Sequence, residues 1–239
     1  MKLSYWFLVF FLFSVLGYIS EVIYCYILDK KLVNRGFLHG PYCPIYGVGA
    51  LASIILLRKY YGDPLILFLL GMFLFSVIEY ISSYLMEKLF NDKWWDYSNY
   101  KYNLNGRVCL KNSIFFGIGG LLVIYVFYPL VYKLIYNANL LALNIITIVL
   151  FILFVTDLVF TIINTLKLKK QRNIIKKIKN EISDKLPNIN DILANNINES
   201  LKKYKNYPKH IINAFPNIKK IHEDNINLLK NSFNNRFRK

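Results

Sequence analysis

Long apolar blocks run through residues 1–166, and they constrain the fold more than any other feature of this sequence. A soluble domain alternates apolar and polar residues at short period and needs no such blocks. An α-helix rises about 1.5 Å per residue, so about 20 apolar residues cross the roughly 30 Å hydrocarbon core of a bilayer. The sequence therefore predicts an integral membrane protein built from spanning helices.

Five spans are expected, at about residues 5–28, 41–58, 64–90, 113–135 and 140–166. The second is short, and it opens with Pro41 and Pro44, which suit the first turn of a helix. A four-span arrangement, in which residues 41–58 form a re-entrant segment, stays open. The first block is longer than a signal-peptide core and lacks a small-residue cleavage site, so it is expected to be retained. The predicted fold class is all-α, a polytopic membrane helix bundle.

Positive charge is concentrated after the last apolar block. Residues 1–166 carry 12 basic and 8 acidic side chains, whereas residues 167–239 carry 18 and 6. Isoleucines at helical spacing in the second region indicate a basic, partly helical C-terminal tail. Cytoplasmic loops of membrane proteins are enriched in Lys and Arg. The five-span arrangement then places the tail and the loops 29–40 and 91–112 in the cytoplasm of a multi-pass protein of the cell membrane, with the N-terminus outside.

Motifs for metals, nucleotides and catalysis are missing from the sequence. The His and Cys residues form no HxxxH, HExxH or CxxC pattern, and there is no Walker A loop. We therefore predict no catalytic residue, no metal and no cofactor, and we do not expect the chain to be an enzyme by itself. The cysteines, Cys25, Cys43 and Cys109, are expected to be small buried residues in a reducing or lipid environment.

Two loops carry residues that spanning helices do not require. The first, residues 34–47, combines glycines and prolines where a span begins, and irregular backbone at that depth needs protein or water to satisfy it. The second, residues 94–110, is rich in Trp, Tyr and Asn; its aromatics also fit anchors at the membrane interface. The motif residues are Asn34, Gly36, Gly40, Pro41, Pro44, Tyr46, Gly47, Trp94, Trp95, Tyr97, Asn103 and Gly106.

Four acidic residues lie in or beside apolar sequence, namely Glu21, Glu79, Glu87 and Asp157. A charge in a span costs about 2.5–3.5 kcal/mol on insertion scales, so such residues usually face the bundle interior and find partners. Glu79 and Glu87 are eight residues apart and share one broad face of a helix. Glu79 lies deepest and is the strongest candidate for a functional role.

Arg35 and Arg107 are the expected counter-ions for Glu21 and Glu87, because both loops lie where these acidic residues end their spans. Two interpretations remain open. The pairs clamp helices together, or they line a substrate pathway or a site for a substrate headgroup. The candidate polar cluster comprises Glu21, Arg35, His39, Glu79, Glu87, Asp96, Asn105 and Arg107.

At these loops the sequence resembles a bacterial family of ABC-transporter permeases, the putative ABC-transporter type IV group. The matching residues are Glu21, Asn34-Arg35-Gly36-Phe37-Leu38, Gly40-Pro41, Pro44-Ile45-Tyr46-Gly47, Glu79-Tyr80, Glu87-Lys88-Leu89-Phe90, Trp94-Trp95-Asp96-Tyr97-Ser98 and Asn103-Leu104-Asn105-Gly106-Arg107. The resemblance covers roughly residues 5–135. It implies a permease-like subunit that docks a separate ATPase subunit and forms a homo- or hetero-oligomer. It supplies no substrate and no catalytic residue.

Three functions fit the sequence. The first is the permease subunit of a transporter. The second is a non-catalytic membrane scaffold or regulator, whose basic tail binds anionic lipid at about 1 kcal/mol per cation near the surface. The third is a membrane enzyme acting on lipid headgroups. Membrane lipids are expected partners in each case. Nucleic acid is not, because the tail has few aromatic residues and no folded reader motif.

Overall fold

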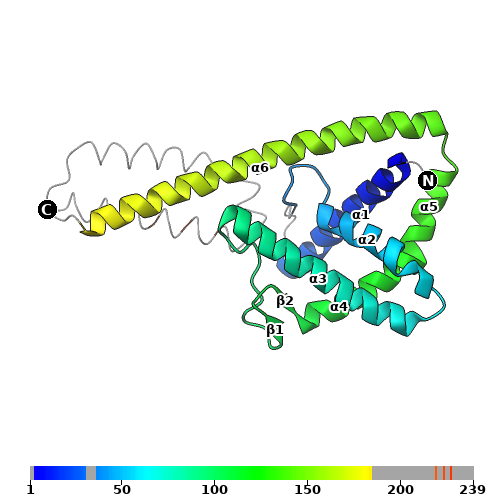
Figure 1. Cartoon of the computed structure of the whole chain (residues 1–239), viewed down its shortest axis with the longest axis horizontal. Coiled ribbons are helices and arrows are strands. Elements are labelled where there is room, and N and C mark those ends of the chain that lie inside the picture. Colours follow the sequence, from blue (N-terminus) through cyan, green and yellow to red (C-terminus); the bar gives the residue numbers. More distant parts are fainter. Residues whose placement is uncertain (1–2, 31–35, 185–218, 220–222, 224–226, 228–239) are drawn as a thin grey trace.

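The computed structural model of the chain describes residues 3–30 and 36–184, together with positions 219, 223 and 227 (Figure 1). Helices dominate this part of the chain, and its strands form one short hairpin. Four helical segments are long and apolar enough to cross a membrane: Leu3–Ile27, Pro64–Phe90, Leu110–Tyr136 and Leu140–Lys167. The prediction of an all-α membrane bundle is confirmed.

The helices and strands follow one another in a simple order. They are α1 (Leu3–Asp29), α2 (Pro44–Leu56), the 3₁₀ turn η1 (Arg58–Tyr60), α3 (Pro64–Phe90), β1 (Asn103–Leu104), β2 (Val108–Cys109), α4 (Leu110–Leu122), the π-helical turn η2 (Val123–Phe127), α5 (Tyr128–Tyr136) and α6 (Leu140–Asp184). The turn η2 joins α4 to α5, and Figure 1 shows the chain changing direction there, as π-helical insertions often cause. α6 continues without a break past its apolar part, across residue 167.

Local chemistry explains both ends of α3. Asp63 caps its first turn, because the side chain accepts a hydrogen bond from the Ile66 N–H (3.1 Å), and Pro64 occupies the first helical position. The helix ends at Asn91, whose φ of 61° is left-handed, a conformation that asparagine tolerates better than most residues. These signals fix a span of 27 residues.

The chain passes along the bundle five times. Figure 1 shows α1, α3 and α6 running in one direction, while α2 and the segment from α4 to α5 return. The parallel path of α1 and α6 is marked by ring contacts, Phe7 with Phe151 and Phe10 with Phe154, each with centroids 5.4 Å apart. The start of α1 and the far end of α6 therefore lie at opposite ends of the molecule.

α2 is the short member of the bundle. Its 13 residues extend about 20 Å, which is less than the roughly 30 Å hydrocarbon core. The chain reaches α2 through a non-helical segment, residues 36–43, which ends deep in the bundle: the Cys43 N–H donates to the carbonyl of Ser14, near the middle of α1 (2.9 Å). Residues 41–58 therefore match neither expected form: they do not make a full-length spanning helix, and they do not turn back as a re-entrant segment would. They form a half-helix preceded by irregular backbone.

The apolar core fills the end of the bundle near the N-terminus. It joins α1, α2, α3, η2 and α5 through Leu8, Val9, Phe13, Ala50, Ile54, Leu67, Ile124, Tyr128, Val131 and Ile135. Toward the other end, buried polar side chains replace this core, among them Ser14, Glu79, Ser83, Ser113, Thr161 and Thr165. The expected burial of all three cysteines is confirmed. The large apolar core therefore closes the N-terminal end of the bundle, and most of the buried polar side chains lie toward the other end, beside a smaller aromatic core of Phe90 and Trp94.

Glycines bring α3 and α4 close together. A Cβ on Gly120 would lie 3.3 Å from the Gly71 Cα, so the two backbones are nearly in contact. Gly117 lies at the same crossing, against the ring of Phe68, whereas a Cβ on Gly119 would meet nothing within 4 Å. Small residues at such crossings let membrane helices pack through their backbones.

Replacement of Gly120 by leucine is expected to lower the free energy of unfolding by about 1–3 kcal/mol, because the new side chain must push α3 and α4 apart. Titration with SDS in mixed micelles measures this free energy. The matched control is Gly119→Leu, the same substitution one residue away, which should stay within about 0.5 kcal/mol. An equal loss in both variants would show that the helix, and not the crossing, is sensitive.

Candidate functional site

Asp157, in the middle of α6, holds the non-helical segment before α2. Its carboxylate accepts hydrogen bonds from the backbone N–H groups of His39 (3.2 Å) and Gly40 (2.9 Å) and from the Tyr42 hydroxyl (2.7 Å). Thr161, one turn further along α6, donates to the same carboxylate (3.2 Å) and contacts the His39 Nδ1 (3.0 Å). One acidic side chain thus satisfies the backbone donors that irregular structure exposes at this depth.

The N-terminal end of α2 lies inside the bundle against α1. Gly47 is needed there because a Cβ would meet Ser14, and Gly17 of α1 leaves room for the ring of Tyr46. The first turn of α2 has no side-chain cap, and helix N-termini carry partial positive charge that favours nearby anions. Glu21 of α1 binds a residue of this first turn, since its carboxylate accepts a hydrogen bond from the Tyr46 hydroxyl.

Glu79, in α3, is the most buried acidic side chain of the described residues, with 8% exposure. Its Oε1 accepts a hydrogen bond from the Tyr97 hydroxyl (3.0 Å), whereas its Oε2 is buried and has no hydrogen-bond partner. Burial raises the pKa of the Tyr97 phenol, and the negative charges of Glu79 and Glu21 raise it further. Both carboxylates therefore act electrostatically on one phenol, and Glu79 also accepts its hydrogen bond. We call Glu21, Tyr46, Glu79 and Tyr97 the carboxylate–tyrosine cluster.

Arg107 and Glu87 form the ion pair that the sequence predicts. The Nη2–Oε2 distance is 2.6 Å, and the two side chains are 14% and 33% exposed. The guanidinium group also lies over the rings of Tyr80 and Tyr84, at 5.6 and 5.4 Å from their centroids. Asn105 donates to the Tyr80 hydroxyl (2.9 Å). Together these contacts attach the hairpin to the last turns of α3.

The hairpin turn depends on asparagine and glycine. Asn105 (φ 55°) and Gly106 (φ 68°) are the central residues of the β-turn closed by the Arg107 N–H on the Leu104 carbonyl (3.0 Å), and both have the left-handed backbone that a type I′ turn requires. The Asn103 side chain accepts from the Gly106 N–H (2.9 Å). Asp96 accepts hydrogen bonds from the hydroxyl and N–H of Ser98, and these bonds lower the pKa of Asp96. Asp96 therefore stabilises its own loop and does not join the carboxylate–tyrosine cluster.

Aromatic contacts join the two motif loops to each other. Phe37 of the first loop packs on Trp94 of the second, with centroids 5.2 Å apart, and both contact Phe90 at the end of α3. Trp94 is only 3% exposed, so its ring lies inside the protein and does not anchor in lipid. The indole of Trp95 donates to the Arg107 carbonyl (3.1 Å). The loops form one structural unit beside the cluster.

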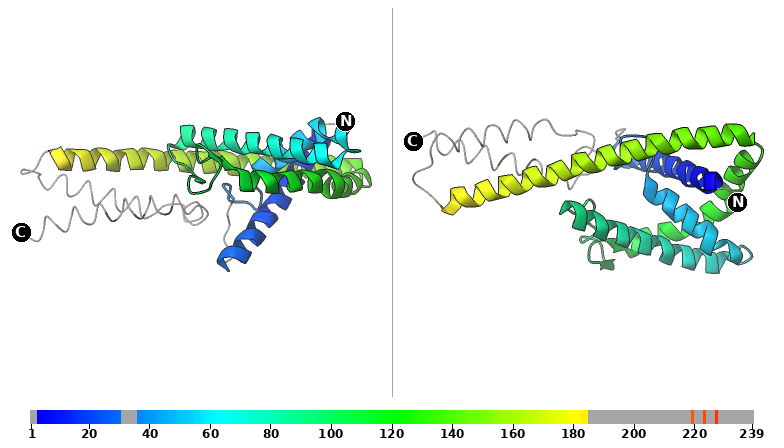
Figure 2. Two further views of the ribbon diagram at one scale, coloured as in Figure 1. Left: turned by 90° about the horizontal axis from the view of Figure 1, so that it is seen from below. Right: turned by 45° about the horizontal axis from the view of Figure 1, so that its top comes forward.

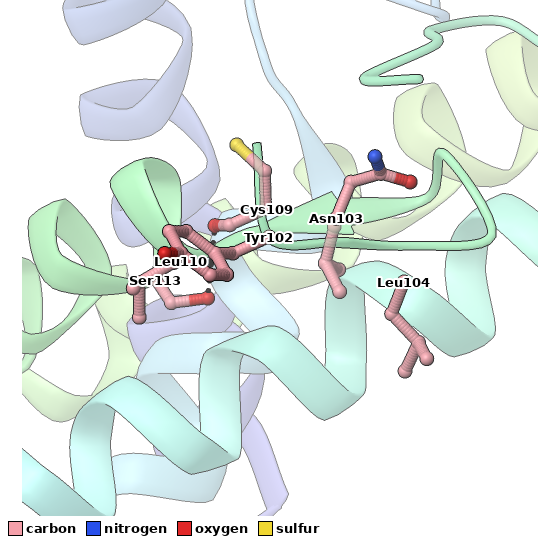
Figure 3. A pocket seen from close by; sticks show the side chains of 7 residues that line it. Tyr102, Asn103, Leu104, Cys109, Leu110 and Ser113 are labelled. Atoms are coloured by element: carbon pink, nitrogen blue, oxygen red, sulfur yellow. Dashed lines mark hydrogen bonds between the residues drawn. The ribbon is translucent and has the colours of Figure 1, made fainter. Parts of the chain in front are cut away.

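A shallow pocket of about 280 Å³ lies on the hairpin (Figure 3). It is lined by Tyr102, Asn103, Leu104, Val108, Cys109, Leu110 and Ser113. Two of its polar groups already have partners, because the Ser113 hydroxyl donates to the Cys109 carbonyl (3.1 Å) and the Leu110 N–H donates to the Tyr102 carbonyl (3.0 Å). The pocket contains no charged side chain, so we place the candidate site at the carboxylate–tyrosine cluster.

The structure leaves two predicted residues untested. Asn34 and Arg35 lie outside the described residues, as does most of the tail beyond Asp184, so the pairing of Arg35 with Glu21 stays a prediction. In the described part of the chain, no group of three or more His, Cys, Asp or Glu residues is placed to hold a metal ion. Of the remaining motif residues, Gly36 is buried, Pro41 is exposed and Pro44 begins α2.

The sequence-based cluster missed several partners. Asp157 lies in the middle of an apolar block, which is a usable signal, but its contacts with Gly40 and Tyr42 join residues more than 110 positions apart. Of the two tyrosines that cover Arg107, Tyr80 was marked only as a neighbour of Glu79 in the family motif, and Tyr84 has no signal of its own among 19 tyrosines.

The model of one protein family, described as putative ABC-transporter type IV, matches residues 8–162, which is more than half of the chain. The chain belongs to this family. The matched region of this type IV family member runs from α1 into the apolar part of α6 and includes both motif loops and the carboxylate–tyrosine cluster. No curated protein and no solved structure matches the chain. With its four long apolar helices, it is a multi-pass membrane protein of a transporter family.

Proposed function

We propose that the chain is the permease subunit of a transporter and that its translocation path passes the carboxylate–tyrosine cluster. The observation that carries this proposal is the discontinuous crossing made by residues 36–43 and α2, beside the buried Glu79. Transporters build substrate sites near the bilayer midplane from helices broken in this way, where helix ends and open backbone meet the cargo. Irregular backbone at membrane depth also requires a protein or water lining.

The distribution of packing supports a path that opens at the end of the bundle carrying the motif loops. The apolar core closes the end near the N-terminus, whereas Ser14, Glu79 and Thr161 lie buried in the half nearer the loops. A substrate entering from the loop end would meet the cluster before it met the apolar core. In this conformation the cluster is closed from the N-terminal end.

The orientation that we propose places the loop end in the cytoplasm and the N-terminus outside. The loop end carries Lys88, Lys93, Lys101, Arg107, Lys111, Lys167, Lys169 and Lys170, and the opposite end carries Arg58, Lys59 and Lys133. This difference agrees with the enrichment of basic residues on the cytoplasmic side of membrane proteins. Figure 2 shows α6 projecting past the bundle at the loop end.

A separate ATPase subunit would dock on this cytoplasmic face. Its natural surface is the outer side of the hairpin, where Tyr102 is 80% and Leu104 58% exposed, together with the projecting end of α6. Exposed apolar side chains beyond the membrane-spanning part are typical of a surface that binds another protein.

Affinity purification in mild detergent from native membranes tests the proposal. We expect a nucleotide-binding subunit to copurify in stoichiometric amount with the wild-type chain, and Tyr102→Glu to reduce its yield at least tenfold. The matched control is Tyr61→Glu, because Tyr61 is an exposed tyrosine at the opposite end (54%). A homo-oligomer with bound lipid and no ATPase would overturn the permease proposal and favour a scaffold or a lipid headgroup enzyme.

A further inference from the structure

Two of the four acidic side chains in the spanning helices have strong partners inside the structure, either an ion pair or several hydrogen bonds. Glu87 pairs with Arg107, and Asp157 has its carboxylate bound by two backbone N–H groups and by the His39 ring (3.1 Å). These two carboxylates already have the partners that a charge in a membrane helix needs.

The other two, Glu21 and Glu79, have no basic partner among the residues that the structure describes. Their hydrogen-bond donors are the phenols of Tyr46 and Tyr97, which are neutral. Charge in a low-dielectric environment is costly unless it is compensated. The carboxylate–tyrosine cluster therefore holds two carboxylates that no cationic side chain of the described residues neutralises.

A second observation points to a hydrogen-bond donor. The Oε2 of Glu79 is buried and without a partner, in a side chain that is more than nine-tenths buried. A buried acceptor without a donor loses the hydrogen bonds that it made in water, which costs about 1–3 kcal/mol and more for a charged group. A ligand with both an N–H donor and a positive charge would supply the missing hydrogen bond to Glu79 and would compensate the negative charge of the cluster.

We infer that the carboxylate–tyrosine cluster is a binding site for a protonated amine, which donates to the Oε2 of Glu79 and lies near the carboxylate of Glu21. The rings of Tyr46 and Tyr97 would add cation–π attraction. A metal ion fits less well, because hard cations take six or more oxygen ligands, and the described residues supply no group of three acidic or His and Cys ligands. The inference names the substrate class of the proposed path, but binding is testable without transport.

The cluster is accessible from one side. Tyr46 is 36% exposed and Glu21 is partly exposed, whereas Glu79 lies at the buried inner end. Ile19 and Ile23, on the same helix as Glu21, are 46% and 54% exposed. An amine could therefore arrive from solution or on the headgroup of a lipid, and both sources share the same ammonium chemistry.

The experiment measures the melting temperature of the full-length protein in detergent with ethylammonium chloride at constant ionic strength. We expect a saturable rise of several degrees over sodium chloride. Tetramethylammonium chloride, which has the same charge and no N–H donor, should give a much smaller rise. The Glu79→Gln and Glu21→Gln variants should lose the response or need at least tenfold more ethylammonium. The control Asp63→Asn, a carboxylate-to-amide change at the cap of the same helix, should respond like the wild type.

Nanodiscs distinguish the two sources. If phosphatidylethanolamine raises the melting temperature over phosphatidylcholine and removes the ethylammonium response, the amine belongs to a lipid; if the response persists, it belongs to a soluble molecule. No response to ethylammonium or to phosphatidylethanolamine, or an undiminished response in Glu79→Gln, would overturn the inference and indicate that Glu79 holds its own proton. Amine binding without a copurifying ATPase would overturn the permease proposal and leave this site in place.

Discussion

Replacing Asp157 with alanine is expected to lower the free energy of unfolding by about 3–5 kcal/mol, the range for removing one partner of a buried charged network. The carboxylate holds the N–H groups of His39 and Gly40 and the hydroxyl of Tyr42, and its side chain is only 13% exposed. Without it these donors lose their acceptor where no bulk water replaces it. SDS titration in mixed micelles measures the loss.

A second measurement reports on the segment itself. Cys43 is 7% exposed and follows the held segment directly, so Asp157→Ala should raise its rate of maleimide labelling in a background with Cys25 and Cys109 replaced by alanine. Asp157→Asn keeps one acceptor oxygen. Its free energy of unfolding and its rate of maleimide labelling should both lie between those of the wild type and Asp157→Ala. Thr156→Ala, which removes only a local hydroxyl bond one residue away, is the control. Equal values for Asp157→Ala and Thr156→Ala would show that other contacts hold the segment.

The spans were predictable because their signal is local. A span is recognised from an apolar block that is long enough to cross a bilayer. Such a block is present in α1, in α3, in the segment from α4 to α5 and in α6. The crossing at 41–58 is different. Its glycines and prolines indicated irregular backbone at the entry, but the depth at which Pro44 begins α2 depends on Asp157, in a helix more than a hundred residues later. No local pattern contains that information.

The candidate site divides in the same way. The pairing of Arg107 with Glu87 was predictable because each loop had one arginine and each neighbouring span ended with an acidic residue. The partner of Glu79 was not, because the motif marks Tyr97 but nothing in the sequence places its hydroxyl at a carboxylate 18 residues earlier in α3. Of the loop aromatics, whose fit as interfacial anchors the sequence left open, Trp94 is buried instead, because its ring packs on Phe37.

The two interpretations that the sequence left open apply to different residues. Clamping describes Glu87 and Asp157, whose carboxylates connect a loop to a helix, Glu87 through its ion pair with Arg107 and Asp157 through hydrogen bonds to the first loop. A pathway describes Glu21 and Glu79, which are hydrogen-bonded only by phenols in the described structure. Replacing Glu87 or Asp157 is therefore expected to lower stability. Replacing Glu21 or Glu79, which are bound only by phenols, is expected to weaken ligand binding.

Replacing Arg107 with alanine is expected to cost about 3 kcal/mol, because Glu87 loses its partner and the hairpin loses its attachment to α3. Arg107→Lys should recover only part of this loss, since an ammonium group does not match a planar guanidinium over the rings of Tyr80 and Tyr84. Arg107→Ala and Glu87→Gln form a double-mutant cycle, in which we expect a coupling energy of about 1–3 kcal/mol. The exposed Lys101→Ala, also in the second loop, is the control.

The same variants separate stability from binding. If Glu87 and Arg107 act as a clamp, Arg107→Lys should lower the melting temperature while the rise produced by ethylammonium is unchanged in size and concentration dependence. Glu79→Gln should show the reverse, because an amide oxygen still accepts the bond from Tyr97 while the charge is removed. A cycle with no coupling would contradict the clamp. Loss of the ethylammonium response in Arg107→Lys would instead extend the amine site to the hairpin, because the hairpin would then have to position Tyr97 for binding.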